Sequence, residues 1–430
     1  MIKAGKIFVF LVFSALFFLS CSKVHVDPVA HPSASAIRFY GNDNGDQLNN
    51  MGATADGGFY FGGSTNTSTS MSSQGFIQKT DNKGNVIWYK EYGGPNQDGF
   101  QSVHAAADGG FIAVGSTNSY GLGATRKDFY SDCWIVKADM NGNIQWQKTF
   151  GNIYSDAFID VAETPDRGFV AVGYFNNPAT GNIGSLYIVK TDQNGNTLWT
   201  KQLYASLFYS TGAAVTIGAN GDIAIAGFIV KSNLSIDQGY DYPAFILISE
   251  TGQLLNYNNS AQPFPDYRNW GYLTPCPNAG GFRAEKIFGM PDGYIIMANN
   301  AAIPDLPPYS VLIFKVDFKG NIIWHQEYSG EHSAVMNDAV LNTSGGLLIS
   351  GATATSSSAD FWLLNIDANG KELWETRIPE PELSGYVAGV VQSGDNFALG
   401  VTMSFPQANR SNYFGFFYTD QNGKITSNAH

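Results

Sequence analysis

The stretch from Asp108 to Phe150 reads DGGFIAVG, then a variable loop, then DCWIVKADMNGNIQWQKTF. Its two apolar runs, Phe111–Gly115 and Trp134–Ala138, are rich in β-branched and aromatic residues and have the length of a strand. The pattern Asp-x-x-Gly that begins at Asp139 is typical of a type I turn followed by a residue with positive φ, which closes a hairpin. The Asp-Gly-Gly at its start indicates another tight turn. The stretch therefore predicts antiparallel strands joined by short turns.

The same order of motifs recurs along the chain at a spacing of roughly 50 to 70 residues. The Asp-Gly-Gly turns, or the residues that replace them, begin at Asp56, Asp108, Asp166, Asn220, Asp292, Ser344 and Gly394. The segment that links one copy to the next supplies a further strand, so each unit has four strands in a radial array. We therefore predict an all-β fold: a seven-bladed β-propeller of four-stranded antiparallel blades over residues 35–430.

The two ends of the repeat array indicate how the ring closes. The seventh copy ends at Lys424–Thr426 without the Trp-containing outer strand. Near the other end, Ala36–Gly41 matches the end of that strand, as seen in Gln145–Gly151. We predict that this N-terminal strand completes the last blade, which removes the open sheet edges that would otherwise invite aggregation.

The repeat units resemble the β-propeller repeats common in lipoproteins and secreted proteins of the Bacteroidota. They are also distantly similar to quinoprotein-type blades, which share the Asp-x-x-x-Gly-x-x-x-Trp ending seen from Asp139 to Trp146, with slightly different spacing. The resemblance covers nearly the whole of the chain after its first 34 residues. It implies an exported propeller and carries over no functional residue, because one fold serves many functions. We expect no cofactor, since no cluster of cationic and amide residues supports a bound quinone.

The first residues have the pattern of an export signal. Lys3 and Lys6 are positively charged, and Ile7–Leu19 is an apolar run. That run is too short to cross a bilayer of about 30 Å as a helix. It is typical of the hydrophobic region of a signal peptide.

The signal ends in Phe18–Cys21, which resembles a lipobox, although Phe18 departs from the usual Leu. We therefore predict a lipoprotein signal peptide over residues 1–21, lipidation of Cys21, and a flexible tether over residues 22–34. An ordinary secretory signal is the alternative. Acyl chains on Cys21 would provide stable membrane attachment. Ser22 lacks the Asp that usually marks inner-membrane retention, so we expect an outer-membrane location, on a side that the sequence does not reveal.

Composition excludes some partners. The formal net charge is −12, from 24 Lys and Arg against 36 Asp and Glu. Nucleic acids and anionic membrane surfaces need clustered Lys and Arg, so we expect neither to bind. Beyond Cys21 the chain contains Cys133 and Cys276, which we interpret as free thiols, with a disulfide as the alternative.

Several residue types recur at fixed repeat positions, and we interpret these as structural. The outer-strand tryptophans are predicted to pack between blades, and they are Trp88, Trp146, Trp199, Trp324 and Trp374. A second set of lysines is predicted to pair with neighbouring carboxylates or to cover apolar surface with their stems, and it consists of Lys79, Lys137, Lys190 and Lys315. Asp46, Asp98 and Asp156 are interpreted as caps of neighbouring turns, with a cation site as the alternative.

The strongest functional signal is a break in the repeat. Between the fourth and fifth copies lies an extra segment, residues 257–282, with aromatic and polar residues side by side. We interpret it as a ligand-binding loop, because loops on rigid scaffolds commonly carry function. Exposed rings beside amide and carboxylate groups suit carbohydrate. The alternative is a loop that packs on itself. The candidate ligand-binding residues are Tyr257, Phe264, Tyr267, Arg268, Trp270 and Tyr272.

Three classes of function follow from these observations. The first is a non-catalytic cell-envelope lipoprotein whose propeller binds a glycan or another extracellular ligand. The second is a scaffold subunit of an outer-membrane protein complex, which an exposed apolar patch on the disc would favour. The third is a glycan-active enzyme, which carboxylates with raised pKa values converging in the channel would favour. No nucleophile motif, His-rich metal pair or phosphate loop is present, so we predict no catalytic residue, no metal site and no enzyme.

Overall fold

A computed structural model of the chain describes thirteen stretches of sequence. These are residues 37–41, 45–66, 72–122, 130–177, 183–203, 208–231, 240–255, 282–300, 310–328, 333–354, 359–378, 384–404 and 413–426. Residues 1–21 and 22–34, the predicted signal peptide and tether, lie outside them. The described residues contain strands and turns, with no helix that has the length and apolar character needed to span a bilayer.

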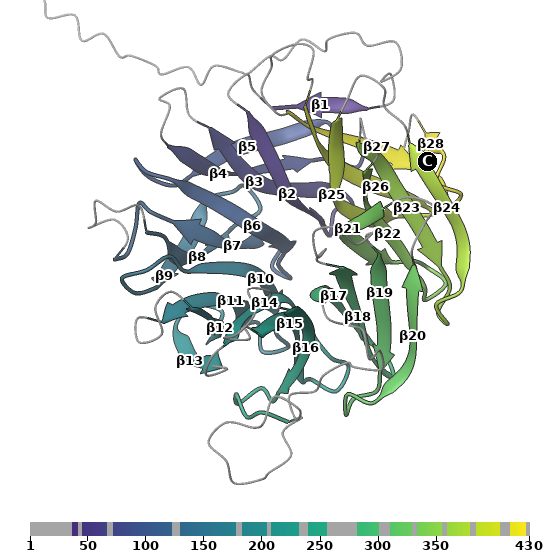
Figure 1. The fold of residues 1–430 in the computed structure, drawn as a ribbon. Helices are drawn as coiled ribbons and strands as arrows, with labels where there is room; N and C mark the ends of the chain where they lie inside the picture. The colour runs from purple at the N-terminus through teal and green to yellow at the C-terminus, as the bar shows by residue number, and fades with distance from the viewer. Residues whose placement is uncertain are drawn as a thin grey trace, which may run out of the picture.

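The strands form seven antiparallel sheets, the blades, arranged around a central axis (Figure 1). Blade 1 consists of β2 (Asp46–Ala53), β3 (Phe59–Asn66), β4 (Ser73–Thr80) and β5 (Val86–Tyr92). Blade 2 consists of β6 (Asp98–Ala105), β7 (Phe111–Thr117), β8 (Asp132–Ala138) and β9 (Ile144–Phe150). Blade 3 consists of β10 (Ala157–Glu163), β11 (Phe169–Asn177), β12 (Ile183–Thr191) and β13 (Thr197–Leu203). Blade 4 consists, among the described residues, of β14 (Phe208–Ile217), β15 (Ile223–Lys231) and β16 (Tyr240–Ile248).

The remaining blades complete the circle. Blade 5 consists of β17 (Phe282–Met290), β18 (Gly293–Asn300), β19 (Val311–Val316) and β20 (Ile322–Tyr328). Blade 6 consists of β21 (Ser333–Leu341), β22 (Leu347–Ala354), β23 (Ala359–Ile366) and β24 (Glu372–Ile378). Blade 7 consists of β25 (Ser384–Ser393), β26 (Asn396–Ser404), β27 (Tyr413–Thr419), β28 (Ile425–Thr426) and β1 (Arg38–Tyr40). The fold is the predicted seven-bladed β-propeller.

Closure of the ring by the N-terminal strand is confirmed. The outer strand of blade 7 is made in two parts, because both β28 and β1 pair with β27. Tyr40 of β1 donates a hydrogen bond to the carbonyl oxygen of Gly84 in blade 1, at 2.5 Å. Tyr92 makes the same bond to Gly142 one blade further on, at 2.8 Å. β1 therefore performs the role of an outer strand.

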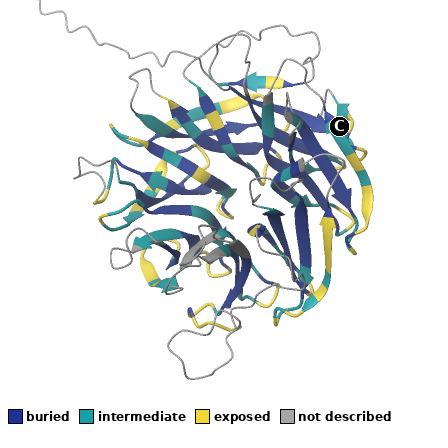
Figure 2. Ribbon diagram, in the orientation of Figure 1, coloured by how far each residue is buried: buried dark blue, intermediate teal, exposed yellow. Residues whose placement is uncertain are grey.

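The core lies between the blades. Each blade is sandwiched by two neighbours, so its middle strands are apolar on both faces, and all seven residues of β8 are buried. The outer strand β9 has mainly exposed or half-buried residues. Seven clusters of buried side chains, one at each interface between neighbouring blades, make a ring of separate small cores. Figure 2 shows this gradient, with buried residues in the middle of the blades and exposed ones at the rim.

Each outer-strand Trp packs on the next blade, as predicted. The contacts lie on the glycine that ends the turn before the outer strand, an Asp-x-x-Gly turn in every case except that of blade 4. This glycine has positive φ and has room for no side chain beneath the indole. At Gly195, for example, a Cβ atom would lie 2.7 Å from the ring of Trp146. We call this contact the interblade clamp, and its pairs are Trp88–Gly142, Trp146–Gly195, Trp199–Gly252, Trp324–Gly370 and Trp374–Gly423.

The recurrent lysines pair with carboxylates, again as predicted. Each reaches the Asp that opens the Asp-Gly-Gly turn of its own blade, or the turn that replaces it. The four pairs, with Nζ–Oδ2 distances of 2.7–2.8 Å, are Lys79–Asp56, Lys137–Asp108, Lys190–Asp166 and Lys315–Asp292. Hydrogen bonds from Lys79 and Thr54 lower the pKa of Asp56 to about 2.

Asp98 and Asp156 cap neighbouring turns, which is the reading preferred from the sequence. Asp98 Oδ2 accepts a hydrogen bond from the amide of Gly94 at 2.8 Å. Asp156 Oδ2 accepts one from the amide of Asn152 at 2.9 Å. Among the described residues no group of three His, Cys, Asp or Glu side chains is placed to hold a metal ion.

Candidate functional site

The innermost strand of every blade carries a β-bulge at the same repeat position. In blade 2 the bulge lies between Phe100 and Ser102, opposite Gly115 of the second strand. A Cβ atom on Gly115 would lie 2.0 Å from the carbonyl oxygen of Gly99, so the close approach of the two strands requires glycine. Bulges commonly redirect a side chain beside a functional site.

The residue that follows the bulge differs from blade to blade. We call these positions the axial ring, and from blade 1 to blade 7 they are Asn50, Ser102, Asp160, Ala214, Lys286, Asp338 and Gly389. Five of them are polar or charged. The ring is thus the place near the axis where side chains of varied chemistry gather.

Three members of the axial ring bind the backbone of the next blade. Asn50 Oδ1 accepts a hydrogen bond from the amide of Val103 at 3.1 Å. Asp160 Oδ2 accepts one from the amide of Val215 at 3.0 Å, and Asp338 Oδ2 accepts one from the amide of Val390 at 2.8 Å. In each case the acceptor occupies the ring position and the donor is the residue after the ring position of its neighbour. These bonds brace successive blades around the axis.

Ser102, His104 and Asp160 form a compact triangle between blades 2 and 3. Ser102 Oγ donates to Asp160 Oδ1 at 2.9 Å, and His104 Nε2 lies 2.9 Å from the same oxygen. The distance from Ser102 Oγ to His104 Nε2 is 3.0 Å. In a catalytic relay the serine and the carboxylate contact different nitrogens of the imidazole. Here both meet Nε2, so the triangle has the geometry of a brace and differs from that of an activated nucleophile.

A second charged group lies between blades 5 and 6. Lys286 Nζ is 2.7 Å from Asp338 Oδ1, with the two side chains 27% and 8% exposed. Burial opposes the charge of Lys286, but Asp338, Asp160 and Glu285 together raise its pKa above the usual value. Burial likewise opposes ionisation of Asp160, but its hydrogen bond with His104 and the charges of His104 and Lys286 lower its pKa. Lys286 therefore links the carboxylates of blades 3 and 6 electrostatically.

The pKa of Glu285, the bulge residue before Lys286, is shifted in the opposite direction to that of Asp160. Burial raises its pKa above the usual value, against a hydrogen bond from Asn299 Nδ2 to Oε2 at 2.7 Å. Asn299 also binds both the amide and the carbonyl of Met336 in blade 6. The inner strands thus hold one carboxyl group, that of Glu285 beside the axial ring, biased towards protonation, and another, that of the ring residue Asp160, biased towards ionisation.

The residues proposed from the sequence are not among those that the structure describes. Cys21, Tyr257, Phe264, Tyr267, Arg268, Trp270 and Tyr272 lie outside the described ranges, as does Cys276. Cys133 is fully buried at the interface of blades 2 and 3, where burial raises the pKa of its thiol well above the usual value. The structure does describe both ends of the candidate segment, Leu255 and Phe282.

Sequence reasoning missed the axial ring because it searched for residues that recur. The ring position is marked by the second-strand glycine, which repeats as Gly63, Gly115, Gly173 and Gly351, whereas the ring residues themselves change. Aligning the copies on that glycine and asking where they differ would have identified these positions.

Comparison with solved structures agrees with the fold. The polysaccharide lyase Uly1 superposes with a TM-score of 0.54 at 10% identity, over 93% of this chain and 94% of that chain. A polysaccharide lyase of the PL25 ulvan lyase family, bound to -[GlcA(1-4)Rha3S]-, gives a TM-score of 0.53 at 9% identity, over 90% of this chain and 97% of that chain. A periplasmic gluconolactonase of Pseudomonas aeruginosa gives 0.47 at 12% identity, over 86% and 95%.

At such low identities the likenesses to the two lyase structures, whose TM-scores are 0.54 and 0.53, show the fold alone. No protein-family model and no curated protein sequence matches the chain. The class that the fold defines is the seven-bladed β-propeller, and the chemistry of this member has to be argued from its own residues.

Proposed function

We propose that this chain is a lipid-anchored protein of the cell envelope whose propeller binds a glycan through residues 257–282 without catalysing a reaction. The observation that supports it is where this segment joins the disc. After β16 the chain reverses direction, with a bridge between Ile248 and Leu254 and a hydrogen bond of 2.9 Å from the amide of Leu255 to the carbonyl of Leu247. It returns at Phe282, which is buried in the core between blades 4 and 5.

The described residues before the segment are therefore hydrogen-bonded to β16, and the segment ends at a buried residue of β17. In blade 2 the same part of the chain, from the end of β8 at Ala138 to the start of β10 at Ala157, contains only an outer strand and a short link. In blade 4 it is extended by a segment that contains Phe264, Tyr267 and Trp270. Rings stack on the C–H faces of sugars, and nearby amide and carboxylate groups bind hydroxyls. A rigid frame lowers the entropic cost of presenting such groups.

The described strands nearest in sequence to the predicted anchor and to the candidate segment lie in opposite parts of the ring. β1, which follows the tether, is in blade 7, whereas β16 and β17 are in blades 4 and 5, across the ring (Figure 1). In this proposal the chain is an outer-membrane lipoprotein of the Bacteroidota type, attached through the residues that precede β1 and binding its ligand through the residues between β16 and β17.

The test is a glycan array and isothermal titration with the soluble protein that starts at Ser22. A Trp270→Ala, Tyr272→Ala double variant is expected to lose saturable glycan binding while its melting temperature stays unchanged. The matched control changes two apolar rim residues, Leu198 and Ile323, to Ala, and it should bind normally. Failure of every glycan on a broad array to bind the wild-type protein would refute the proposal. Incorporation of labelled fatty acid that is abolished by Cys21→Ser tests the anchor separately.

A scaffold subunit of an outer-membrane complex is the alternative, and one observation favours it. A half-exposed apolar residue precedes the clamp Trp in four blades, at Ile87, Leu198, Ile323 and Leu373, with exposures of 51–55%. These residues lie on the outer strands of blades 1, 3, 5 and 6. Cross-linking in the native membrane, with Ile323→Glu and Leu373→Glu as disrupting variants, tests whether the rim contacts a protein.

A glycan-active enzyme is a further candidate, because of two carboxyl groups in and beside the axial ring. Groups whose surroundings push their pKa values apart can act as acid and base, and Glu285 and Asp160 are biased in opposite directions. Reducing-end and unsaturated-product assays over a polysaccharide panel test this, with Glu285→Gln as the variant expected to abolish any turnover. Turnover that survives in that variant would exclude Glu285 as the acid in catalysis.

A further inference from the structure

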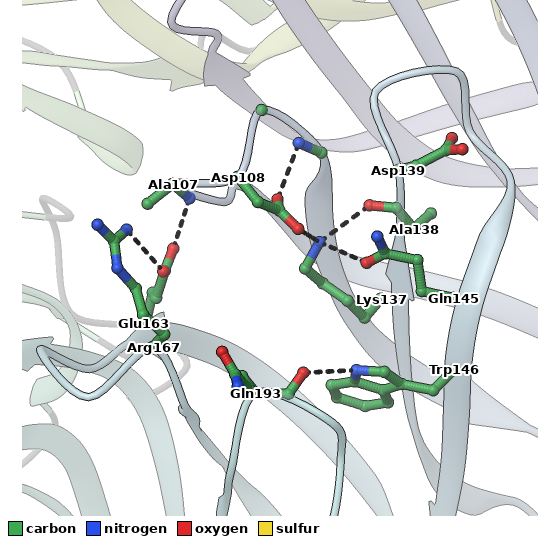
Figure 3. A network of polar contacts seen from close by, with 12 residues as sticks. Ala107, Asp108, Lys137, Ala138, Asp139, Gln145, Trp146, Glu163, Arg167 and Gln193 are labelled. Carbon is green, nitrogen blue, oxygen red and sulfur yellow. Dashed lines mark hydrogen bonds and ion pairs between the residues drawn. The ribbon is translucent and has the colours of Figure 1, made fainter.

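A groove between blades 2 and 3 is independent of residues 257–282. Its volume is about 680 Å³, and its lining comes from the turns at one end of both blades. This size lies within the ordinary range for small-molecule sites, about 300–1,000 Å³. Figure 3 shows the two charged pairs of the groove near one another, with Trp146 and Gln193 facing them.

One wall is a fixed polar network of blade 2. Lys137 Nζ lies 2.7 Å from Asp108 Oδ2, 3.0 Å from Gln145 Oε1 and 3.1 Å from the carbonyl of Ala138. The lysine is buried, but Asp108 is 49% exposed and Gln145 is exposed. The buried cation therefore holds two surface groups in place, and their remaining hydrogen-bonding capacity faces solvent.

The other wall belongs to blade 3 and departs from the repeat. Glu163 Oε2 accepts the amide of Ala107 at 2.7 Å, which ties the two blades together, and Glu163 Oε1 lies 3.4 Å from Nη1 of Arg167. Glu163 is 20% and Arg167 60% exposed at the side chain. The guanidinium is therefore held loosely and offers most of its five N–H donors to a ligand.

Arg167 occupies a position that other blades give to glycine. Its φ is 65°, and the equivalent residues Gly57, Gly109, Gly221 and Gly345 have φ values of 79–84°. A side chain in this left-handed region is strained, and such strain collects at functional sites. At the Glu163 position the same four blades have Ala53, Ala105, Ile217 and Leu341, so the ion pair is peculiar to this interface among the aligned turns.

At the base of the groove, the edge of an indole ring is hydrogen-bonded to a backbone carbonyl. Trp146 is half-buried, and its Nε1 donates to the carbonyl of Gln193 at 3.0 Å. That bond belongs to the interblade clamp, so Trp146 is fixed whether or not a ligand is present. Gln193 and Asn194 complete the lining with exposed polar side chains.

We propose that this groove binds a neutral saccharide. Its charges cancel in two pairs, Lys137 with Asp108 and Arg167 with Glu163, within a chain of net charge −12, so nothing there selects an anion. The lining is too polar for an aliphatic ligand. Planar guanidinium, carboxylate and amide groups beside the edge of an indole match a ligand that presents vicinal hydroxyls.

The decisive variant is Arg167→Gly, because it restores the residue that the other blades use and relieves the backbone strain. Its melting temperature should be equal to or above that of the wild type, so lost binding cannot be ascribed to unfolding. The probes are cellotriose, mannotriose and galactotriose, followed by saturation-transfer NMR and isothermal titration on the soluble protein that starts at Ser22. The expected result is at least about a tenfold loss of affinity for the trisaccharide that binds, equivalent to about 1.4 kcal/mol.

Two controls separate this site from the proposed function. Lys83→Ala removes one exposed positive charge from a turn of blade 1 and should leave binding unchanged. Trp270→Ala, Tyr272→Ala should also leave it unchanged, since the groove uses neither residue. Absence of binding for all three trisaccharides up to about 10 mM, ten times a weak Kd of about 1 mM, overturns the proposal. So does wild-type affinity in Arg167→Gly, or loss of affinity only in the Trp270→Ala, Tyr272→Ala variant.

Discussion

The interblade clamp and the axial ring both join neighbouring blades, but they do so in opposite ways. The clamp uses the same two residues, Trp and Gly, at five interfaces. The ring uses seven positions with six residue types, from Asn50 to Gly389. A contact that repeats without change is what any blade needs in order to pack on the next. A position whose residue type differs between blades, although its neighbours repeat, does not require one particular residue for that packing. This difference separates packing residues from candidates for function.

The largest expected effect on stability tests the repeated packing, at a core position that recurs in the blades. Trp134 is fully buried and stacks on Phe100 with ring centroids 4.8 Å apart. Trp134→Ala should lower the free energy of unfolding by about 4 kcal/mol through lost burial and the cavity that remains. Urea unfolding followed by circular dichroism measures it. Trp134→Phe is the control, because blade 1 has Phe76 at this position, and it should cost much less. A loss below about 1 kcal/mol for the Ala variant would contradict the packing role.

The next largest effect concerns the pH dependence of stability and comes from Asp156, a residue that recurs at this repeat position. Burial raises the pKa of Asp156 to about 7, against hydrogen bonds from the amides of Asn176 and Asn152, and the charge of Asp132 raises it further. An unfolded Asp has a pKa of about 3.9. The contribution of Asp156 to folding stability is therefore fully present below about pH 4 and is lost as the pH rises through about 7. We expect the protein to lose on the order of 2 kcal/mol of stability between about pH 5 and about pH 8.

The matched variant for this effect is Asp132→Gln, because Gln74 occupies the equivalent position in blade 1. It should reduce the loss of stability at high pH without abolishing it, since burial remains the larger cause. Thermal unfolding of both proteins across the pH range measures this. If the wild type instead became more stable from about pH 5 to about pH 8, the predicted direction of the pH dependence would be wrong.

A smaller effect sharpens the comparison within the clamp itself. Trp199 Nε1 donates to the carbonyl of Glu250 at 3.0 Å. Trp324 Nε1 is buried and has no hydrogen-bond partner among the described residues. Trp199→Phe should therefore cost about 1–1.5 kcal/mol more than Trp324→Phe, because only the former removes a hydrogen bond. Equal costs in denaturant unfolding would mean that the hydrogen bond adds nothing to the clamp.

The smallest effect is expected in the axial ring. Ser102→Ala removes one donor to Asp160, which keeps its contacts with His104 and the amide of Val215. Blade 4 already has Ala214 at this position, so the ring tolerates alanine. We expect a loss of at most about 1 kcal/mol and an unchanged fold. If the loss of stability were as large as that of Trp134→Ala, the axial ring would belong to the repeated packing. The distinction between packing residues and ring residues would then fail.

The fold was predictable because its determinants are local and repeated. The Asp-x-x-Gly turn at Asp139, the Asp-Gly-Gly turn at Asp108 and the Trp of each outer strand lie within a few residues of the strands that they organise. Seven imperfect copies compensate for the degenerate one that starts at Asn220. The partial outer strand Arg38–Tyr40 was recognisable because it matches the missing end of the seventh copy.

The axial ring was not predictable in this way, since its members come from different blades and share no residue type. A bulge changes the register of one strand without changing the composition of the sequence around it, so Lys286 and Asp338 give no local sign that they will meet. The groove did leave a sign in the sequence. Arg167 interrupts a position that is otherwise glycine in four other copies, and that break became meaningful once its backbone conformation was known.

The divided outer strand of blade 7 also sets the order in which the ring can form. β1 is synthesised early and its partner β27 late, with nearly the whole chain between Arg38 and Phe416. Until β27 exists, the growing array has two unpaired edges, which are the surfaces most prone to wrong pairing. A contact of such long sequence separation also forms slowly. The interval between the first and the last strand is therefore the period in which the nascent protein most needs protection from its neighbours.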